Sequence, residues 1–415
     1  MPAASVRVAV ATAGLTVAAA RRATVPTPRA TPHARTLALP RTTPTQPPDR
    51  ATATVGPPRS VTPGAGRGRQ FLAHLNLIQV VCWQVALLAV VLAVRQPWPV
   101  LVCVSVGATV LVALTTVRIG GRWLHQHGVL AVGYLSRDRR RDLPEGDGKT
   151  PALLDLLIPN CTVRAVETGY GLAMTTSHRS GLTAVLRPRD GDPEPAVDRL
   201  PTPTALIALV DGQQRAAGAQ TVYHAGIRRD TPAKVWLAVH AARSVETPGD
   251  DELTLVLRNA VRRVRRALVR AGVPTEPLTE ETAFAVIAGL AHVSGGRNEV
   301  REDWRFWRAG PVCQATFRLS GWHRLADPQA RKLIAELLTV TVGVAVTVTV
   351  GARPDHDGPR VNAVLRLAGT TEAAVEAAVA ATAVRATPYG VGLARLDGAH
   401  SRGVAGSLPI GVFVT

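Results

Sequence analysis

The stretch that decides the fold reads LIQVVCWQVALLAVVLAV at residues 77–94 and, after Arg95-Gln96-Pro97, WPVLVCVSVGATVLVALTTV at residues 98–117. The first run has no charged residue over 18 positions, and the second has none over 20. As helices they would extend roughly 27 Å and 30 Å, which matches a hydrocarbon core of about 30 Å. Neither run carries the polar stripe of a surface helix. The pattern predicts a transmembrane two-helix hairpin at residues 71–119, and the alternative is a hairpin buried in a large soluble core.

Residues at the ends of the two runs predict the orientation and anchoring of this hairpin. Trp98 and Trp123 stand where interfacial aromatic residues are enriched. Arg118 and Arg122 follow the second run, and the turn between the runs carries only Arg95. More arginines flank the hairpin at its two outer ends, namely Arg67, Arg69, Arg137, Arg139, Arg140 and Arg141. The positive-inside rule therefore predicts a multi-pass protein of the cell (inner) membrane with both termini in the cytoplasm.

Two glutamines are the polar intrusions in the first run. Gln79 and Gln84 lie five positions apart, about 140° around a helix, so they point to different faces. The second run offers Ser105, Gly107 and Thr109, which can receive only one of these faces. Because an unsatisfied amide in lipid is costly, we expect at least one glutamine to contact another membrane subunit.

The first 70 residues differ in composition from the rest of the chain. They contain ten arginines and a single acid, Asp49, so they carry a net charge of +9. This is half of the formal net charge of +18. A uniform nucleic-acid-binding surface is therefore a poor explanation of the charge, and we expect no nucleic-acid partner. The Pro/Arg-rich composition predicts a disordered tail, whose arginines could also hold anionic lipid. Residues 6–20 resemble the apolar part of a signal peptide, but cleavage there would place Arg67 and Arg69 on the wrong side of the membrane.

Residues 120–150 read as a basic juxtamembrane linker. Gly148-Lys149-Thr150 resembles the end of a phosphate-binding loop. That motif needs a glycine five residues before the final glycine, where Leu143 stands, and a helix directly afterwards, where Pro151 stands. We exclude a phosphate-binding loop.

The residues from 151 onward predict a cytoplasmic α+β body of two subdomains, residues 151–300 and 301–415. In the first, short alternating runs predict strands, and apolar residues at helical spacing predict helices. The predicted strands are 162–167, 170–175, 181–187, 219–224 and 233–242, and the predicted helices are 204–210, 250–271 and 279–292. In the second, strand and helix patterns follow the order β-α-β-β-α-β of a ferredoxin-like fold. They lie at residues 312–319, 327–338, 339–351, 360–368, 371–385 and 390–396.

The predicted helix at residues 250–271 has an arginine-rich outer face, consisting of Arg258, Arg262, Arg263, Arg265, Arg266 and Arg270. Such a run is typical of a solvated helix face. Docking of a partner, of anionic headgroups or of RNA are the alternatives, but no aromatic residues are interleaved as RNA binding would favour. A membrane-tethered lipid- or RNA-binding protein therefore stays open as a class.

The sequence offers only weak evidence for catalytic or metal-binding groups. The four cysteines have no metal-ligand or redox spacing. Asp190-Gly191-Asp192 and Asp355-His356-Asp357 could hold a divalent cation in a membrane-anchored glycosyltransferase, but both lie in Gly/Pro-rich loops where Asp is a common turn former. The sequence therefore predicts no enzyme, no cofactor and no metal site.

Several motifs resemble EccE of the type VII (ESX) secretion system. They are Glu302-x-Trp304, Phe317-x-Leu319-x-Gly321-Trp322, the run GVGLARLDG at residues 390–398, and Ser407-Leu408-Pro409-Ile410-Gly411, in that order after a hairpin. Ala399-His400 departs from the more acidic pair expected after Leu-Asp-Gly. The resemblance implies a non-catalytic structural subunit of an inner-membrane export complex. It also implies partners, namely other membrane subunits and the ATPase of that complex.

Overall fold

The computed structural model describes residues 77–119, 122–169, 171–189, 199–210, 217–228, 230–245, 247–355 and 358–414. The predicted disordered tail and the signal-like segment lie outside the described residues. The same holds for Asp190, Asp192, His356 and Asp357 of the two acidic loops.

The two apolar runs form helices that pack against each other. They are α2 (Leu77–Ala93) and α3 (Trp98–Thr116), and the second begins directly after Pro97. Gln79 is 1% exposed and its Nε2 donates to the carbonyl oxygen of Thr115 at 2.9 Å. Trp83 Nε1 donates to Thr115 Oγ1, also at 2.9 Å. The position on α3 that receives Gln79 is therefore Thr115, and the expectation of Ser105, Gly107 or Thr109 was wrong.

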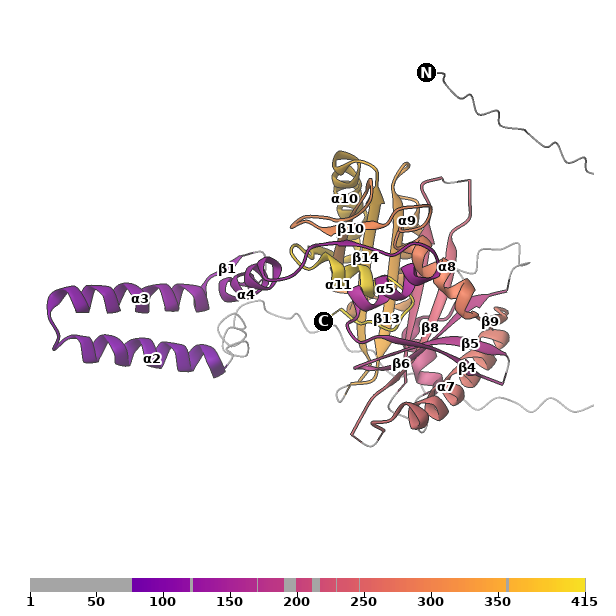
Figure 1. Cartoon of the computed structure of the whole chain (residues 1–415), viewed down its shortest axis with the longest axis horizontal. Coiled ribbons are helices and arrows are strands. Elements are labelled where there is room, and N and C mark those ends of the chain that lie inside the picture. Colours follow the sequence, from indigo (N-terminus) through magenta and orange to yellow (C-terminus); the bar gives the residue numbers. More distant parts are fainter. Residues whose placement is uncertain are drawn as a thin grey trace, which may run out of the picture. The chain divides into compact units, whose positions relative to one another are not determined.

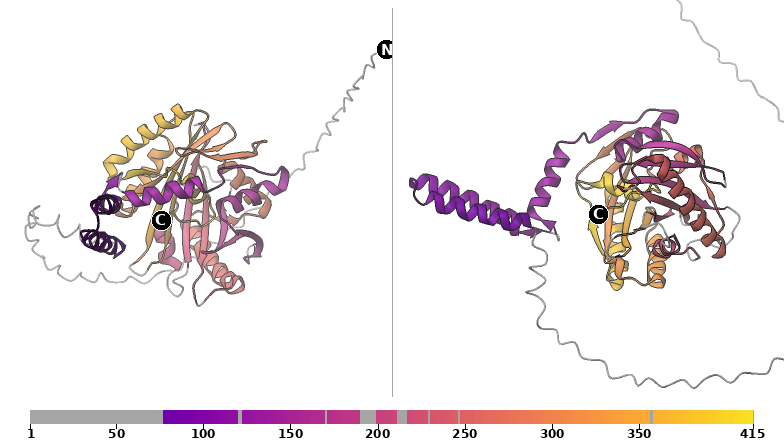
Figure 2. Two further views of the ribbon diagram at one scale, coloured as in Figure 1. Left: turned by 60° about the vertical axis from the view of Figure 1, so that its left-hand side comes forward. Right: turned by 90° about the horizontal axis from the view of Figure 1, so that it is seen from below.

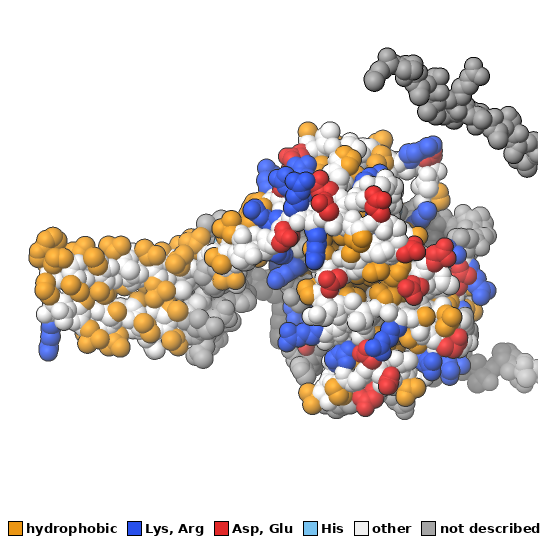
Figure 3. Space-filling view, in the orientation of Figure 1, with side chains coloured by type: hydrophobic (Ala, Val, Ile, Leu, Met, Phe, Trp, Pro, Cys, Tyr) orange, Lys and Arg blue, Asp and Glu red, His pale blue; other side chains and the backbone are white. Residues whose placement is uncertain are grey.

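Apolar side chains cover the outside of this helix pair (Figure 3). By length and composition, α3 is the one described helix that could span a membrane, and α2 is apolar but shorter. Leu87, Leu92 and Val106 are each more than half exposed. An apolar surface of this kind requires lipid or another protein as its neighbour.

Residues 120–150, predicted as a linker, contain several regular elements. β1 (Arg118–Ile119) pairs with β2 (Arg122–Trp123), and α4 (Leu124–Leu135) follows directly. β3 (Arg140–Asp142) then pairs antiparallel with β10 (Glu299–Glu302), so the segment is part of the sheet. A short turn, η1 (Gly146–Gly148), leads into α5 (Lys149–Leu157), which buries Leu153 and Leu154.

Apart from β1 and β2, the strands form one large antiparallel sheet (Figure 1). Its order is β3-β10-β11-β12-β14-β13-β7-β8-β6-β5-β4, with β9 on β6 and β15 on β12. Their bounds are β4 (Thr162–Glu167), β5 (Leu172–His178), β6 (Gly181–Pro188), β7 (Ala217–Ala225), β8 (Lys234–Ala242), β9 (Thr275–Pro277), β11 (Trp307–Ala309), β12 (Val312–Ser320), β13 (Ala345–Arg353), β14 (Arg360–Gly369) and β15 (Gly392–Arg395). The body therefore combines helices with one large antiparallel sheet, which confirms the predicted mixture of α and β structure.

The same order of elements occurs twice along the chain. Apart from short 3-10 turns, residues 149–277 run α5-β4-β5-β6-α6-β7-β8-α7-β9, and residues 280–395 run α8-β10-β11-β12-α9-β13-β14-α10-β15. The pairing is also repeated: β8 lies between β6 and β7, as β14 lies between β12 and β13. Each repeat is a split β-α-β unit. The equivalent strands β7 and β13 pair antiparallel, so an approximate two-fold axis relates the repeats.

Helices cover both faces of the sheet (Figure 2). One face packs α6 (Pro203–Val210), α7 (Asp250–Arg270), α9 (Asp327–Leu338) and α10 (Glu372–Ala386) over the larger apolar core. The other packs α5, α8 (Glu280–Leu290), α11 (His400–Gly406) and the C-terminal segment, which we define as residues 407–414. Many strand side chains on this second face are polar, among them Thr183, Gln220, His240, Thr316, Thr347, Thr349 and Arg366.

Not every arginine predicted on the outer face of α7 is there. Arg265 is 8% exposed, and its Nε and Nη2 donate to the carbonyl oxygen of Thr275 at 3.1 and 2.7 Å. The prediction that Arg265 lies on the solvated face was therefore wrong. The chain after α7 folds back along the helix, and Arg265 supplies the hydrogen bonds that the buried carbonyl oxygen of Thr275 needs. Arg262, Arg266 and Arg270 are exposed as predicted.

Candidate functional site

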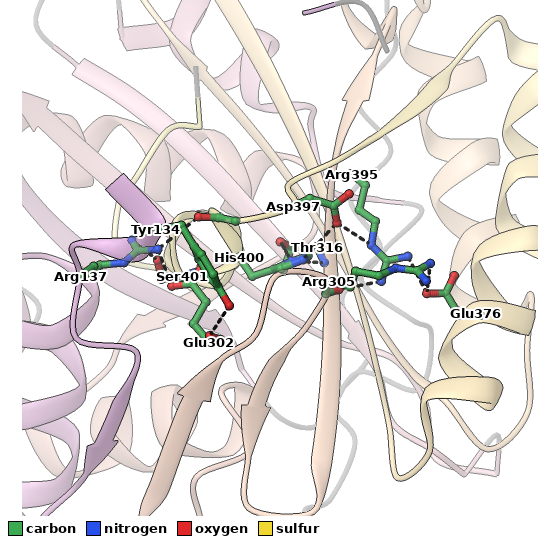
Figure 4. Close-up of polar contacts among 11 residues, drawn as sticks. Tyr134, Arg137, Glu302, Arg305, Thr316, Glu376, Arg395, Asp397, His400 and Ser401 are labelled. Atoms are coloured by element: carbon green, nitrogen blue, oxygen red, sulfur yellow. Dashed lines mark hydrogen bonds and ion pairs between the residues drawn. The ribbon is translucent and has the colours of Figure 1, made fainter. Parts of the chain in front are cut away.

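The end of α4 is tied to the second repeat by a cluster of polar contacts that we call the junction. It consists of Tyr134, Arg137, Glu302, Trp304, Gly398 and Ser401. Figure 4 shows Tyr134, Arg137, Glu302 and Ser401 of this cluster. These residues come from α4 and the turn after it, from β10 and the turn after it, and from the start of α11. Three segments that are far apart in sequence therefore meet at one point.

A buried carboxylate lies at the centre of the junction. Glu302 is 5% exposed, and its Oε2 lies 2.8 Å from Arg137 Nη2. Its Oε1 accepts a hydrogen bond from the backbone N–H of Ser401 at 3.1 Å. Arg137 also donates to Ser401 Oγ and to the carbonyl oxygen of Gly398, each at 3.2 Å. A buried charge is tolerated only when it is paired and hydrogen-bonded, and Glu302 satisfies both conditions.

Aromatic packing completes the junction. The rings of Tyr134 and Trp304 meet edge to face with centroids 5.2 Å apart. The N–H of Gly398 donates to the carbonyl oxygen of Trp304 at 2.8 Å, and the Trp304 ring lies so close that a Cβ on Gly398 would come within 2.6 Å of it. Gly398 also has φ +68°, a conformation that side chains disfavour. Glycine is required at this position for both reasons.

A second polar network extends from the junction towards α10. Arg395 Nη1 lies 2.7 Å from Glu376 Oε1, and Arg395 Nε lies 3.1 Å from Asp397 Oδ1. The fully buried ring of His400 has Nε2 3.6 Å from the same Asp397 oxygen, while its Nδ1 lies 2.9 Å from Thr316 Oγ1. His400 of the pair Ala399-His400, which departs from the motif of the resembling family, is thus hydrogen-bonded to Thr316 on one side and lies near the Asp397 carboxylate on the other.

The C-terminal segment crosses the polar face of both repeats. Gln220 of β7 donates through Nε2 to Gly406 O at 2.9 Å and accepts from Gly411 N at 3.0 Å. Thr349 of β13 donates to Ser407 O at 3.4 Å. Phe413 packs edge-on against His240, whose ring centroid is 5.7 Å away. Burial lowers the pKa of His240 to about 3, so this histidine is neutral at pH 7.

The arrangement is suited to holding segments together and contains no recognisable catalytic constellation among the described residues. No group of three or more His, Cys, Asp and Glu side chains in that part of the chain could hold a metal ion. Asp355 lies in a tight turn, since Asp355 and Gly358 exchange backbone hydrogen bonds of 3.1 and 3.2 Å. Its acidic loop otherwise lies outside the described residues.

The structure describes some, but not all, of the side chains that were predicted to anchor the helix pair in the membrane or to contact a partner. Trp98 is 76% exposed at the start of α3. The backbones of Arg118, Arg122 and Trp123 form β1 and β2, but their side chains lie outside what is described. Gln79 is satisfied within the helix pair, whereas Gln84 is exposed on α2. The two glutamines therefore face different directions.

The motifs that were quoted for the resemblance touch one another in the fold. Trp304 contacts Gly398, and a Cβ on Gly321 would come within 2.6 Å of the Gly390 carbonyl oxygen. Sequence reasoning missed the role of Glu302 as the buried partner of Arg137. The Glu302-x-Trp304 motif was the signal available in the sequence. The two residues lie on either side of the turn after β10, and both take part in the junction.

A large antiparallel sheet with helices on both faces, following two apolar helices, defines a mixed α/β protein of duplicated architecture. Residues 234–319 match the family described as "Putative type VII ESX secretion system translocon, EccE". The match covers about a fifth of the chain, from β8 to β12, and it includes Glu302, Trp304, Phe317 and Leu319. The resemblance to EccE is confirmed over these residues. No protein in the curated set matches the chain.

Proposed function

We propose that the chain is a non-catalytic structural subunit of an inner-membrane protein-export complex of the type VII kind. The observation that carries the proposal is the match of residues 234–319 to the EccE family. The exposed apolar surface of α2 and α3 supports membrane anchoring by the helix pair. A subunit of this kind would assemble with the other membrane subunits and with the ATPase of the complex.

The junction supports a structural role for the segment between anchor and body. A flexible linker would leave the body free to rotate about its anchor. Here β3 is paired with β10, the turn after α4 is held by the Arg137–Glu302 ion pair, and Tyr134 of α4 packs on Trp304. A force on the helix pair, or a movement of it in the membrane, would therefore be transmitted to the second repeat.

The proposed function is tested by purifying the tagged full-length protein from its native membrane in mild detergent. We expect the protein to migrate in a large assembly that contains an ATPase. The matched control is a variant with residues 77–117 replaced by an unrelated hairpin of two membrane helices, which keeps the anchor but not its surface. A wild-type protein that migrates as a monomer under conditions that preserve the assembled ATPase would contradict the proposal.

The proposed orientation, with both termini in the cytoplasm, has its own test. Reporter proteins fused after Arg59 and after Thr415 should both report a cytoplasmic location. A fusion after Gln96, in the turn between α2 and α3, should report the opposite side. If either outer fusion is active on the periplasmic side, the orientation is wrong.

A further inference from the structure

One side of α4 carries a stripe of large apolar side chains. Val129, Val132 and Leu135 are 71%, 67% and 70% exposed, and their spacing of three residues places them on the same side of the helix. Gly128 and Gly133 lie on this side as well, and nothing lies within 4 Å of a Cβ at either position. This side of α4 is therefore apolar and is not covered by the described residues.

The opposite side of α4 is packed on the body. The ring of Tyr134 contacts Trp304 of the junction, and its hydroxyl donates to the carbonyl oxygen of Glu302 at 3.4 Å. His127 and Leu130 are partly buried on the same side. The helix thus has one side that contacts protein and one side whose aliphatic groups favour an environment other than water.

The helix α4 begins at the point where the apolar helix α3 ends. The pairing of β1 with β2 reverses the chain, so that the N–H of Leu124 donates to the carbonyl oxygen of Val117 at 2.9 Å. Leu124 is the first residue of α4, and Val117 directly follows α3. From there α4 runs across the direction of the helix pair (Figure 2, right). On the proposed anchoring, a helix in this position lies along the membrane surface.

The exposed apolar surface of α3 extends to this same point. Leu114 and Val117 are 37% and 42% exposed, and Val117 is the residue that is hydrogen-bonded to Leu124. The helices α3 and α4 also pack against each other. The environment that covers the end of α3 is therefore within reach of the first turn of α4.

Arginines follow α4 directly. Residues 137–142 contain four arginines against two aspartates. Arg139, Arg140 and Arg141 are exposed, and among the described residues neither Arg139 nor Arg141 forms an ion pair. Basic side chains gather at this end of the body (Figure 3). Exposed arginines beside an apolar helix face are complementary to anionic lipid headgroups.

We propose that α4 lies in the surface of the membrane, with the stripe of Val129, Val132 and Leu135 inserted among the lipids and with Arg139 and Arg141 at anionic headgroups. The proposal rests on the membrane anchoring proposed above and goes beyond it, because an anchor needs only α2 and α3. Lipid fits this side of α4 better than another protein subunit does. Three aliphatic side chains are few for a stable protein interface, which involves about 20 residues or more on each partner.

The test uses a phospholipid that carries a photoreactive diazirine in its acyl chain, close to the headgroup. The full-length protein is reconstituted into vesicles that contain this lipid, irradiated and digested with trypsin. Because trypsin cleaves after arginine, it releases α4 within residues 123–137 and α3 within residues 96–118. We expect lipid adducts on both peptides. Residues 244–258 form the control peptide, which should carry none although Val245 and Leu255 are 92% and 61% exposed.

A serine variant tests the apolar stripe. Val129→Ser combined with Val132→Ser and Leu135→Ser removes the stripe without changing the side of α4 that packs on the body. It should reduce the adducts on residues 123–137 about fivefold or more, because the binding of an interfacial helix scales with its apolar area. The adducts on residues 96–118 should stay unchanged. The matched control, Val245→Ser with Leu255→Ser, removes exposed aliphatic groups elsewhere and should leave both peptides labelled as in the wild type.

A charge variant tests the contact with headgroups. In the wild type we expect the adducts on residues 123–137 to increase about twofold when anionic phosphatidylglycerol is added to vesicles of phosphatidylcholine. Arg139→Gln combined with Arg141→Gln should abolish this increase. A variant that responds to phosphatidylglycerol as the wild type does would overturn the assignment of these arginines to headgroups.

Adducts on residues 96–118 without adducts on residues 123–137 would overturn the proposal and leave the membrane anchoring intact. Absence of adducts from both peptides would contradict the anchoring as well. Adducts that form in vesicles, but not when the same lipid is incorporated into the native membrane, would mean that another subunit covers α4 and would also overturn the proposal. These outcomes are decided by the wild-type protein, so they do not depend on the folding of a variant. A serine variant that folds and is labelled as the wild type is would exclude the stripe as the contact.

Discussion

Arg137 Nη2 lies 2.8 Å from Glu302 Oε2, and this contact fixes the segment after α4 to β10. The two partners are unequally buried, since 38% of the Arg137 side chain is exposed against 5% for Glu302. Removing Arg137 would leave a buried carboxylate that water cannot reach, whereas removing Glu302 would leave an arginine that water can hydrate. The two changes should therefore lower the stability of the protein by different amounts.

The first prediction follows from this asymmetry. Arg137→Met leaves a buried carboxylate without its cation and should lower the free energy of unfolding by about 2 kcal/mol. Glu302→Gln keeps an acceptor for Ser401 N–H and leaves a hydrated arginine, so it should lower that free energy by only about 1 kcal/mol. Urea denaturation of the detergent-solubilised protein measures both. The control is Arg140→Met, whose exposed pair with Glu299 should contribute less than about 0.5 kcal/mol. Equal effects of the two junction variants would contradict the argument.

The second prediction separates the two glutamines of α2. Gln79→Leu removes the hydrogen bond to Thr115 O and should weaken packing between α2 and α3. Gln84→Leu removes no hydrogen bond within the described residues, and on the proposed function it should reduce recovery of the complex in mild detergent. Co-purification of the ATPase, normalised to the amount of tagged protein, measures the effect. Recovery of Gln84→Leu at the wild-type level would show that assembly does not use this face of α2.

The third prediction concerns acid sensitivity near the start of α7. A side-chain hydrogen bond from Arg243 is the main cause that holds the pKa of Asp250 below its ordinary value of 3.8, and Ser177 also donates to it. A carboxyl group with a lowered folded-state pKa stabilises the fold above its unfolded-state pKa, and this stability is lost as the pH falls through the folded-state value. Asp250→Asn should therefore lower the free energy of unfolding by about 1 kcal/mol at pH 7.

The difference between wild type and Asp250→Asn should stay constant from pH 7 to about pH 5 and shrink below pH 3.8. Urea denaturation at a series of pH values measures it. A difference that grows on acidification would show that the sign is wrong.

The fourth prediction uses two helical glycines as a matched pair. A Cβ on Gly403 of α11 would lie 2.1 Å from Thr316 Oγ1, and Thr316 is itself held by His400. Gly403→Ala should therefore lower the free energy of unfolding by about 2–3 kcal/mol. Gly289 of α8 has nothing within 4 Å of its Cβ position, so Gly289→Ala should be neutral or stabilise by up to about 1 kcal/mol. Thermal unfolding of both variants distinguishes packing from helix propensity, and similar midpoints would contradict the role assigned to Gly403.

Local elements with clear periodicity could be predicted from the sequence. The bounds of α9 and β4 agree with their predictions. In α9 the reason is a single apolar face at helical spacing, which buries Leu333, Ile334 and Leu337. β13 begins at Ala345 and not at Thr339, since Gly343 adopts φ +82° in the turn before it. α4 was missed because Gly128 and Gly133 obscure a short helix within a segment that its arginines mark as a linker.

The order of the strands and most of the candidate site could not be predicted. The pairing of β7 with β13 joins segments that no local pattern relates. Glu302 became recognisable as a buried acid only once β3 and β10 were paired, because side-chain burial depends on which strand is the neighbour. The full burial of Arg366 on β14 gave no signal either, since an arginine in a strand pattern is usually read as facing solvent.

The path of residues 407–414 has a consequence for biosynthesis. Gln220 of the first repeat and Thr349 of the second both form hydrogen bonds with this end of the chain. Their polar face remains open to water until Ile410 and Gly411 have left the ribosome, whereas α2 and α3 are synthesised some 300 residues earlier. On the proposed membrane anchoring, the nascent protein is held at the bilayer while its sheet is still incomplete. A protein cut short before Ile410 would therefore be anchored while the polar face of its sheet stays uncovered.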